Sequence, residues 1–275
     1  GVAFAKFTAV FFPALGEKNI LFALLGLQVT AAQVLAIGVI VLLTWLNLRG
    51  LRTGKLIQDV FTLTKTAALL GLIAVAIAWG ANDFAISANF SDFWNASWTR
   101  LQSGGGFSVD PLTGFSVLAA IGVAMVGSLF SSDAWNNITF TAGEVVNPKR
   151  NIPLSLALGT GIVTVLYLLA NLAYILVLPV KGSPEGADAV SRGIQFALSD
   201  RVATAAVSTI FGTAAEVIMA GLIMVSTFGC NNGLILAGAR VYYAMALDGL
   251  FFKKTGELNK RSVPAFALVI QSVWA

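Results

Sequence analysis

The sequence predicts an all-α, polytopic membrane helix bundle. Of its 275 residues, 57% are hydrophobic and 11% are charged, and the mean hydropathy is +0.84. Soluble domains carry about 25% charged residues, so this composition excludes an ordinary soluble protein. Several apolar stretches reach the roughly 20 residues that a membrane-spanning helix needs. Ten-residue stretches of alternating polar and apolar residues, which are typical of membrane β-barrels, are absent from the sequence.

Seven candidate membrane helices cover most of the chain, which we interpret as a single transmembrane domain over residues 1–275. They fall at about 1–15, 29–48, 56–80, 113–142, 152–179, 212–246 and from 264 onward. The first and last are incomplete because apolar runs reach both chain ends, which indicates a fragment of a longer membrane protein. Pro153 lies near the first turn of the fifth stretch, where proline is tolerated. The loop at 81–112 is rich in Trp, Phe, Asn and Ser, which indicates an interfacial segment.

Basic residues predict the orientation of the chain. The loops at 49–55, 143–151 and 247–263, with Arg240 at a helix end, hold ten of the 17 Lys and Arg residues, and the opposite loops hold five. Basic residues gather in cytoplasmic loops, so these three loops are predicted to be cytoplasmic in a multi-pass plasma-membrane protein. The net charge of +4 therefore needs no nucleic-acid partner. Histidine is absent and Cys230 is the one cysteine, which excludes imidazole metal sites and an intrachain disulfide.

The segment SLFSSDAWNNITF, residues 128–140, places polar side chains inside the fourth apolar stretch. Polar side chains are costly in lipid unless they have partners or line a cavity. The Ser-Ser-Asp run at 131–133 competes with the helix for hydrogen bonds, which predicts an interruption. One half-helix would end near Phe130 and the next would begin near Trp135, leaving carbonyl and N–H groups free for a ligand. The alternative is a continuous helix whose polar face packs on its neighbours.

Lys65 is a second polar group at membrane depth. It follows Lys55 by ten residues, or about 15 Å along a helix, which is too deep for easy snorkelling to the surface. Its ammonium group is therefore predicted to meet backbone carbonyls or a carboxylate. A snorkelling lysine near the interface is the alternative.

A third polar place is STFGCNNG, at 226–233. Gly229 and Gly233 form a G-x-x-x-G pair, which lets a second helix approach closely. Close packing explains the small residues but not the adjacent amides of Asn231 and Asn232, which need hydrogen-bond partners.

These three places together resemble one family, the amino-acid permeases of the APC superfamily, and above all their L-type exchanger branch and its bacterial relatives. Helix six, the next loop and the start of helix seven in that family are similar to FSSDAWNNITFTAGEVVNPKRNIPLSLALG, residues 130–159. Helix five resembles QDVFTLTKTAALLGL, and helix eight with its following loop resembles STFGCNNGLILAGARVYYAMALDG. The resemblance implies a partial LeuT-like fold of inverted repeats, with family helices three to nine in this chain.

The resemblance also implies roles for single residues. Phe130 would be an aromatic gate over the substrate, nearby carbonyls would bind the α-ammonium, and Asn136 would brace the unwound segment. Lys65 would take the place of a sodium ion, which implies sodium-independent transport. The implied substrate-binding residues are Phe130, Ser131, Ser132, Asp133, Trp135 and Asn136. The implied coupling or structural residues are Lys65, Ser226, Thr227 and Asn231.

Asp133 departs from the family pattern, in which the exchangers usually carry glycine or another small residue. A carboxylate at this position could narrow the pocket, pair with a cationic group or accept a proton. The hypothesis is that Asp133 influences the charge preference for substrates or the pH dependence of transport.

The predicted function is secondary active transport of amino acids by alternating access, as sodium-independent exchange or proton-coupled uptake, without enzymatic chemistry, cofactor or metal. The predicted partners are an amino-acid substrate and the lipid bilayer, and the sequence leaves an accessory subunit open. An ion channel is one alternative, but it needs a charged ring or carbonyl filter that is not visible. A proton-relay membrane subunit using Lys65, Asp133 and Glu216 is the other, but no paired carboxylates accompany them.

Overall fold

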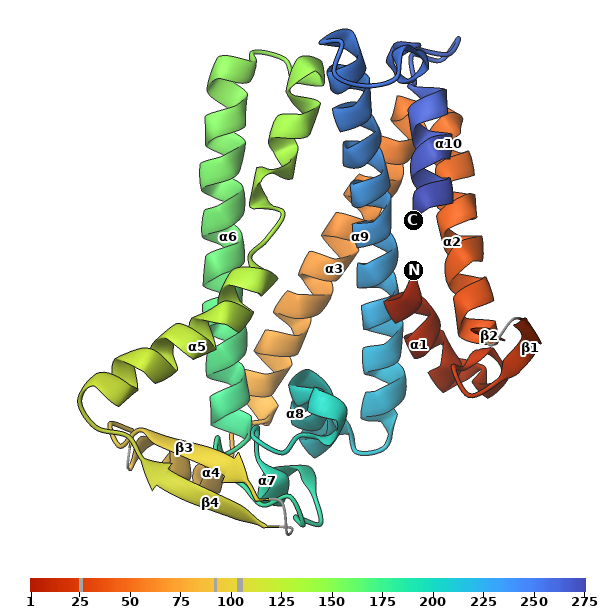
Figure 1. Cartoon of the computed structure of the whole chain (residues 1–275). Helices are drawn as coiled ribbons and strands as arrows, with labels where there is room; N and C mark the ends of the chain where they lie inside the picture. Colours follow the sequence, from red (N-terminus) through yellow and green to blue (C-terminus); the bar gives the residue numbers. More distant parts are fainter. Residues whose placement is uncertain (25–26, 92, 103–105) are drawn as a thin grey trace.

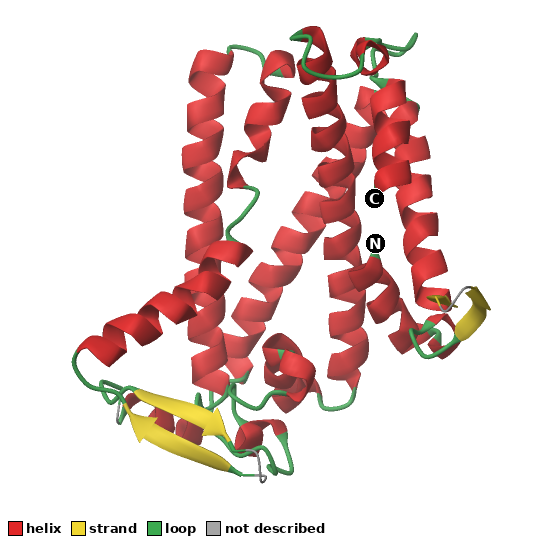
Figure 2. Cartoon of the chain, in the orientation of Figure 1, coloured by secondary structure: helices red, strands yellow, loops and turns green. Residues whose placement is uncertain are grey.

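The computed structural model describes residues 1–24, 27–91, 93–102 and 106–275, and these form a bundle of long helices with small hairpins at one end (Figures 1 and 2). Seven helices follow the predicted stretches: α1 (Val2–Phe11), α2 (Ala31–Leu48), α3 (Leu51–Trp79), α5 (Phe115–Ser131), α6 (Pro148–Val177), α9 (Ala214–Leu247) and α10 (Ala265–Trp274). Within the described residues, five helical spans are long and apolar enough to cross a membrane. The prediction of a polytopic helix bundle is confirmed.

The structure adds short elements that the sequence did not predict. Strands β1 (Ile20–Leu24) and β2 (Leu27–Thr30) form one antiparallel hairpin, and β3 (Ser97–Leu101) and β4 (Phe107–Pro111) form another. The remaining short elements are α4 (Asp83–Phe90), α7 (Ala189–Arg192), α8 (Val202–Phe211) and the 3₁₀ turns η1 (Pro13–Leu15), η3 (Leu198–Asp200) and η4 (Lys253–Gly256). A two-stranded hairpin is marginally stable alone, so these strands depend on the helix ends beside them.

Asn89 attaches α4 to the end of α6. Its Nδ2 donates hydrogen bonds to the carbonyls of Ile175 (2.7 Å) and Leu178 (2.9 Å), and its Oδ1 accepts one from the N–H of Val180 (2.7 Å). Two of these groups are carbonyls near a helix C-terminus, where carbonyls lack intrahelical partners. The interfacial loop is thereby held against the end of a membrane span.

The three basic loops lie together at the end of the bundle opposite β3 and β4 (Figure 1). The first is shorter than predicted, because α3 begins at Leu51 and leaves only Arg49 and Gly50 between α2 and α3. The third loop contains η4. The predicted orientation requires these three loops to lie on the same side of the membrane, and their common position agrees with that. Their assignment to the cytoplasm stays a prediction.

Helix α9 is central, and small residues let α3 approach it. A Cβ atom added at Gly229 would lie 2.8 Å from Cβ of Phe61, and one added at Gly233 would lie 3.3 Å from the amide of Gln58. A methyl group at either position would push α3 outward. The close packing predicted from the G-x-x-x-G pair is confirmed.

Asn232 is fully buried and joins three helices. Its Oδ1 accepts a hydrogen bond from Nδ2 of Asn47 on α2 (2.9 Å), and its Nδ2 donates to Oε1 of Gln58 and to the carbonyl of Gly54 on α3 (both 3.2 Å). We call Asn47, Gln58 and Asn232 the amide cluster. The prediction that Asn232 needs partners is confirmed. For Asn231 it holds only in part: its Oδ1 accepts from the amino group of Gly1 (3.1 Å), but its buried Nδ2 has no partner among the described residues.

Candidate functional site

The helix is interrupted where the sequence predicts it. Helix α5 ends at Ser131, and the 3₁₀ helix η2 (Trp135–Glu144) begins after residues 132–134, which form a non-helical turn (Figure 2). Ala134 has φ of +68°, a left-handed conformation that is uncommon for a residue with a side chain. We call residues 132–134 the α5–η2 break. The alternative of a continuous helix is wrong.

The break leaves peptide groups without helical partners. The N–H of Asp133 donates to the carbonyl of Phe130 (3.3 Å), which closes the last turn of α5. Within the described residues, the N–H groups of Ala134 and Trp135 have no acceptor. Free N–H groups at the start of a helix attract negative charge. At the end of α5 the carbonyls of Phe130 and Ser131 each accept one hydrogen bond, and a carbonyl oxygen has a second lone pair for another donor.

A cavity of about 380 Å³ lies between α3, α6 and α9. Lys65 from α3, Tyr167 from α6 and Ser226 from α9 line it, and we call it the Lys65 cavity. Tyr167 connects this cavity to the break, because its hydroxyl donates a hydrogen bond to the carbonyl of Ser131 (3.2 Å). Among the described residues Lys65 has no hydrogen bond or ion pair, so the carbonyls or carboxylate predicted to meet its ammonium are not found there.

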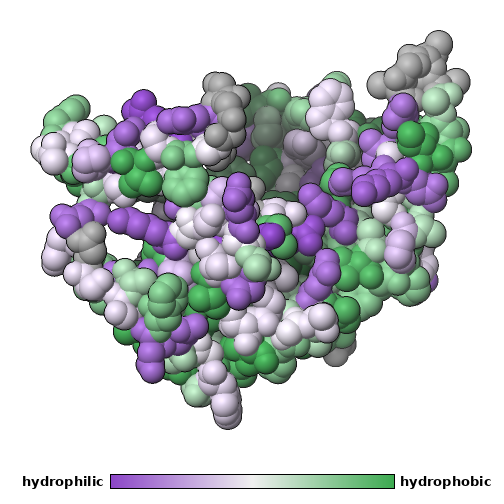
Figure 3. Space-filling view, turned by 90° about the horizontal axis from the view of Figure 1, so that it is seen from below, coloured by the Kyte–Doolittle hydropathy of each residue, from purple (hydrophilic) through white to green (hydrophobic). Residues whose placement is uncertain are grey.

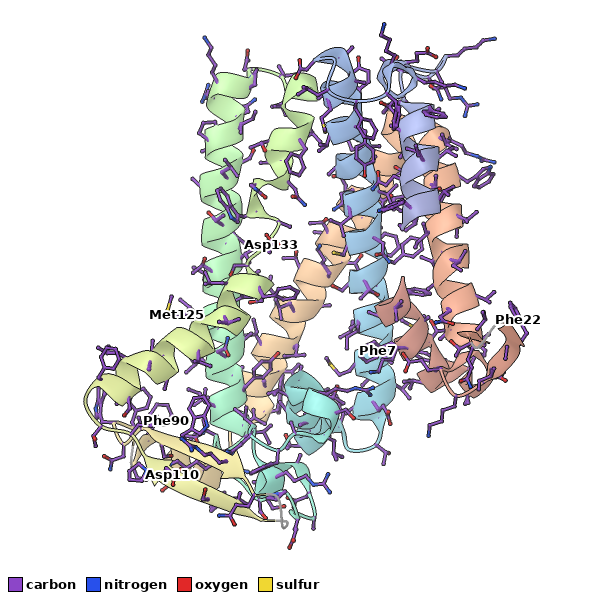
Figure 4. All side chains as sticks on the ribbon, viewed as in Figure 1. Phe7, Phe22, Phe90, Asp110, Met125 and Asp133 are labelled. Carbon is purple, nitrogen blue, oxygen red and sulfur yellow. The ribbon has the colours of Figure 1, made fainter. Side chains whose placement is uncertain are left out.

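The predicted substrate-binding residues gather around the break and are exposed. The side chain of Phe130 is 83% exposed and that of Trp135 is 59% exposed. Asp133 lies at the turn itself (Figure 4). Phe130 therefore covers no closed pocket within the described residues. Their role in substrate binding stays a prediction.

The predicted coupling residues separate into two groups. Lys65 and Ser226 both line the Lys65 cavity. The hydroxyl of Thr227 instead donates to the carbonyl of Ile223 in its own helix (2.8 Å), and Asn231 is bonded to Gly1. Of the four residues, the structure brings only Lys65 and Ser226 to a common cavity.

Sequence reasoning missed Tyr167. It lies in an apolar helical run with no motif around it, and its partner is a backbone carbonyl, which leaves no mark in sequence. A tyrosine at membrane depth needs a hydrogen-bond partner for its hydroxyl. This requirement could have identified Tyr167 as a candidate residue.

We expect Tyr167→Phe to lower the transport rate several-fold in the full-length protein, because the carbonyl of Ser131 loses its donor while the ring keeps its packing. Initial uptake rates in liposomes measure the effect. Tyr174→Phe is the matched control, since Tyr174 also lines the Lys65 cavity from α6. Equal rates in the two variants would show that the hydroxyl of Tyr167 does not support the break.

Comparison with known proteins identifies the family of this chain. A family model described as amino acid permease matches residues 1–275. The b(0,+)-type amino acid transporter 1 of Mus musculus is 29% identical over 245 residues, which cover 88% of this chain and 43% of that protein. The same transporter of Rattus norvegicus is 30% identical over 238 residues, covering 85% and 42%. The large neutral amino acids transporter small subunit 2 of Homo sapiens is 25% identical over 258 residues, covering 90% and 40%.

The chain spans less than half the length of these curated relatives. Their names describe transporters and not enzymes. The match to the family model extends over every residue, and the helical spans are those of a multi-pass membrane protein. This chain belongs to the amino acid permease family.

Proposed function

We propose that the protein containing this chain is a secondary active transporter of amino acids that works by alternating access around the α5–η2 break. The observation that carries the proposal is the non-helical turn at 132–134, which is joined through Tyr167 to the Lys65 cavity. Irregular backbone inside a membrane span is tolerated where it lines a cavity. The names of the related transporters support amino acids as the substrate class.

In the proposed mechanism the ligand contacts are mainly peptide groups. Carbonyls at the end of α5 bind the α-ammonium, and Phe130 covers the bound substrate. Asn136 braces the turn from η2. The substrate binds the inward-facing and outward-facing states with different free energies. This difference shifts the protein between the two states, so that the site opens to one side of the membrane and then to the other without a covalent step.

Lys65 supplies a fixed positive charge in the proposed mechanism. Its side chain is half-buried and faces Ser226 across the Lys65 cavity. A permanent ammonium group at this position does the work that a bound sodium ion would do, so transport is independent of sodium. Without a sodium gradient, transport is driven either by exchange of one substrate for another or by a proton gradient.

Counterflow in liposomes tests the proposal. The full-length protein is reconstituted with a high internal concentration of one unlabelled amino acid, and transient accumulation of the labelled form is measured with choline in place of sodium. Accumulation is expected with one or more amino acids. A proton ionophore separates exchange, which continues, from proton-coupled uptake, which stops. Conductance without counterflow would support a channel, and proton movement without amino-acid flux would support a proton-relay subunit.

We expect Asp133→Asn to lower uptake of cationic amino acids about tenfold relative to neutral ones, the equivalent of about 1.4 kcal/mol. Asp133 is exposed at the break and has no ion pair among the described residues, so its charge is available to a substrate. Competition between labelled arginine and leucine at several pH values measures this ratio. Asp59→Asn, on the exposed face of α3, is the control. An unchanged substrate range and pH profile would contradict the role of Asp133.

We also propose that the protein lies in the plasma membrane with the loops at 49–55, 143–151 and 247–263 in the cytoplasm. Support comes from the excess of basic residues in these loops and from their common end of the bundle (Figure 1). Labelling of single cysteines introduced at Lys149 and Lys181 by an impermeant reagent tests it. Only the cysteine at position 181 is expected to react in intact cells.

A further inference from the structure

A second cavity, of about 510 Å³, lies at the end of the bundle away from the basic loops. One continuous stretch, residues 187–216, supplies all of its lining residues, from α7 through η3 and α8 to the start of α9. We call it the α7–α9 cavity. Its volume is in the range of small-molecule sites. Figure 3 views the molecule from this end and shows hydrophilic residues among apolar ones.

Four charged residues line the α7–α9 cavity in equal numbers of each sign. They are Arg192, Arg201, Asp188 and Glu216. The other lining residues are alanine, glycine, serine and threonine, with Leu198 as a larger apolar residue among them. Balanced charge in a cavity lined otherwise mainly by small side chains favours a ligand that carries both signs, and disfavours a simple anion or cation.

Arg201 and Glu216 form a loose ion pair, which leaves hydrogen-bonding atoms of both side chains available to such a ligand. Nη1 of Arg201 is 3.9 Å from Oε1 of Glu216, which is too long for a hydrogen bond. Their side chains are 27% and 61% exposed, respectively. The guanidinium of Arg201 lies 5.0 Å from the ring centre of Phe7 on α1, a cation–π contact that orients it (Figure 4 shows Phe7).

Asp188 and Arg192 hold the wall of the cavity. The N–H and hydroxyl of Ser191 both donate to Oδ1 of Asp188 (2.8 and 2.7 Å), and these bonds keep the pKa of Asp188 below its usual value. Nε of Arg192 donates to the carbonyl of Gly186 (2.6 Å). Ser199 in the wall has φ of +55°, a conformation that serine rarely adopts and that is enriched at functional sites.

We propose that the α7–α9 cavity is a second binding site for a free amino acid, in which Arg201 binds the α-carboxylate and Glu216 binds the α-ammonium. The inference rests on the proposed function, because it assigns this cavity to the same class of substrate. The cavity adjoins the first one: Ala203 lines the Lys65 cavity, while its neighbours Thr204 and Ala205 line the α7–α9 cavity. An amino acid bound here lies beside the Lys65 cavity.

Binding stoichiometry and transport kinetics of the full-length protein test the inference. Labelled leucine, serine and arginine are used singly as probes, by equilibrium dialysis in nanodiscs and by counterflow in liposomes. The wild type is expected to bind two molecules per chain of a probe that it transports. Glu216→Gln and Arg201→Gln are expected to bind one, and to raise KM about tenfold from this side with kcat unchanged.

Substrate analogues identify which charge each residue binds. The methyl ester of the probe lacks the carboxylate and the N-acetyl form lacks the ammonium. Arg201→Gln is expected to abolish discrimination against the methyl ester at the second site, and Glu216→Gln to abolish discrimination against the N-acetyl form. Arg100→Gln is the control, because Arg100 lies on β3 at the same end and pairs with Asp110 outside the cavity (3.5 Å).

The outcomes separate the two proposals. Absence of counterflow with any amino acid in the wild type overturns the proposed function and this inference with it. Counterflow in the wild type, with stoichiometry and KM unchanged in Glu216→Gln, overturns only the second site. Glu216 is mostly exposed, so this variant is expected to fold even where Arg201→Gln loosens α8 from Phe7.

Discussion

Asn232→Leu is expected to destabilise the protein by about 2 kcal/mol, because buried amides that lose a partner bear the cost of desolvation. Leucine keeps the branched shape of the asparagine side chain but replaces its oxygen and nitrogen with larger methyl groups, which cannot form hydrogen bonds. Nδ2 of Asn47 and Oε1 of Gln58 each lose the partner that Asn232 supplies. The apparent midpoint of thermal unfolding in detergent should fall by several degrees, and transport should fall with it, because the amide cluster holds α3 in register with α9 near Lys65 and Ser226.

A double-mutant cycle separates the amide cluster from a general effect of substitution. Asn47→Leu together with Asn232→Leu should cost less than the sum of the two single changes, because the second change removes a group already unpaired. Asn171→Leu is the control: Asn171 is exposed on α6, and within the described part of the chain its Nδ2 bonds only the carbonyl of Tyr167 in its own helix (2.8 Å). Strict additivity in the cycle, or equal loss in the control, would contradict coupling among the three amides.

Gly54→Ala is expected to cost about 1–3 kcal/mol through overpacking, although alanine is the better helix former. The added Cβ would meet Oδ1 of Asn47, and it would lie 3.0 Å from Cδ2 of Leu236. Asn47 has little freedom to yield, because its Nδ2 is bonded to the carbonyl of Leu43 (2.8 Å) and to Asn232. The substitution therefore separates α2 from α3 or breaks the amide cluster.

Gly71→Ala in the same helix is the matched control for Gly54→Ala. A Cβ atom at Gly71 meets nothing within 4 Å, so the gain in helix propensity, roughly 0.5–1 kcal/mol, is not opposed. Thermal unfolding of the full-length protein should move in opposite directions for the two variants. A Gly54→Ala protein as stable as Gly71→Ala would show that α2 and α3 are not in tight contact here.

Seven helices and the α5–η2 break were predictable because their causes are local. Hydropathy over some 20 consecutive residues marks a span whatever its neighbours are. Ser132 and Asp133 compete with the helix from within their own turn, so the break also needs no distant partner to be recognised. A close approach at Gly229 was predictable because small residues leave a helix surface open, but the identity of the approaching helix, α3, was not.

The hairpins and α8 were not predictable, and neither were the partners of the buried amides. A strand of five residues such as Ser97–Leu101 lies in a short polar loop that shows no periodicity, and Asn89 attaches α4 to a carbonyl of α6 that is 86 residues away. Glu216 was noticed as a membrane carboxylate in a proton relay. The structure places it instead beside Arg201 at the rim of a cavity.

The sequence by itself determined which segments are apolar enough to cross a membrane, where one of them is interrupted and which helix face is open to close contact. Only the tertiary structure decided that Asn47 meets Asn232, 185 residues away, that Tyr167 bonds the carbonyl of Ser131, and that residues 187–216 enclose a charged cavity. Hydropathy acts over a single span, and polar side chains compete for backbone hydrogen bonds within a single turn, so both effects can be recognised from the local sequence. Side-chain partners and cavities depend on the angles and rotations at which whole helices pack, and these are set by the sum of all contacts.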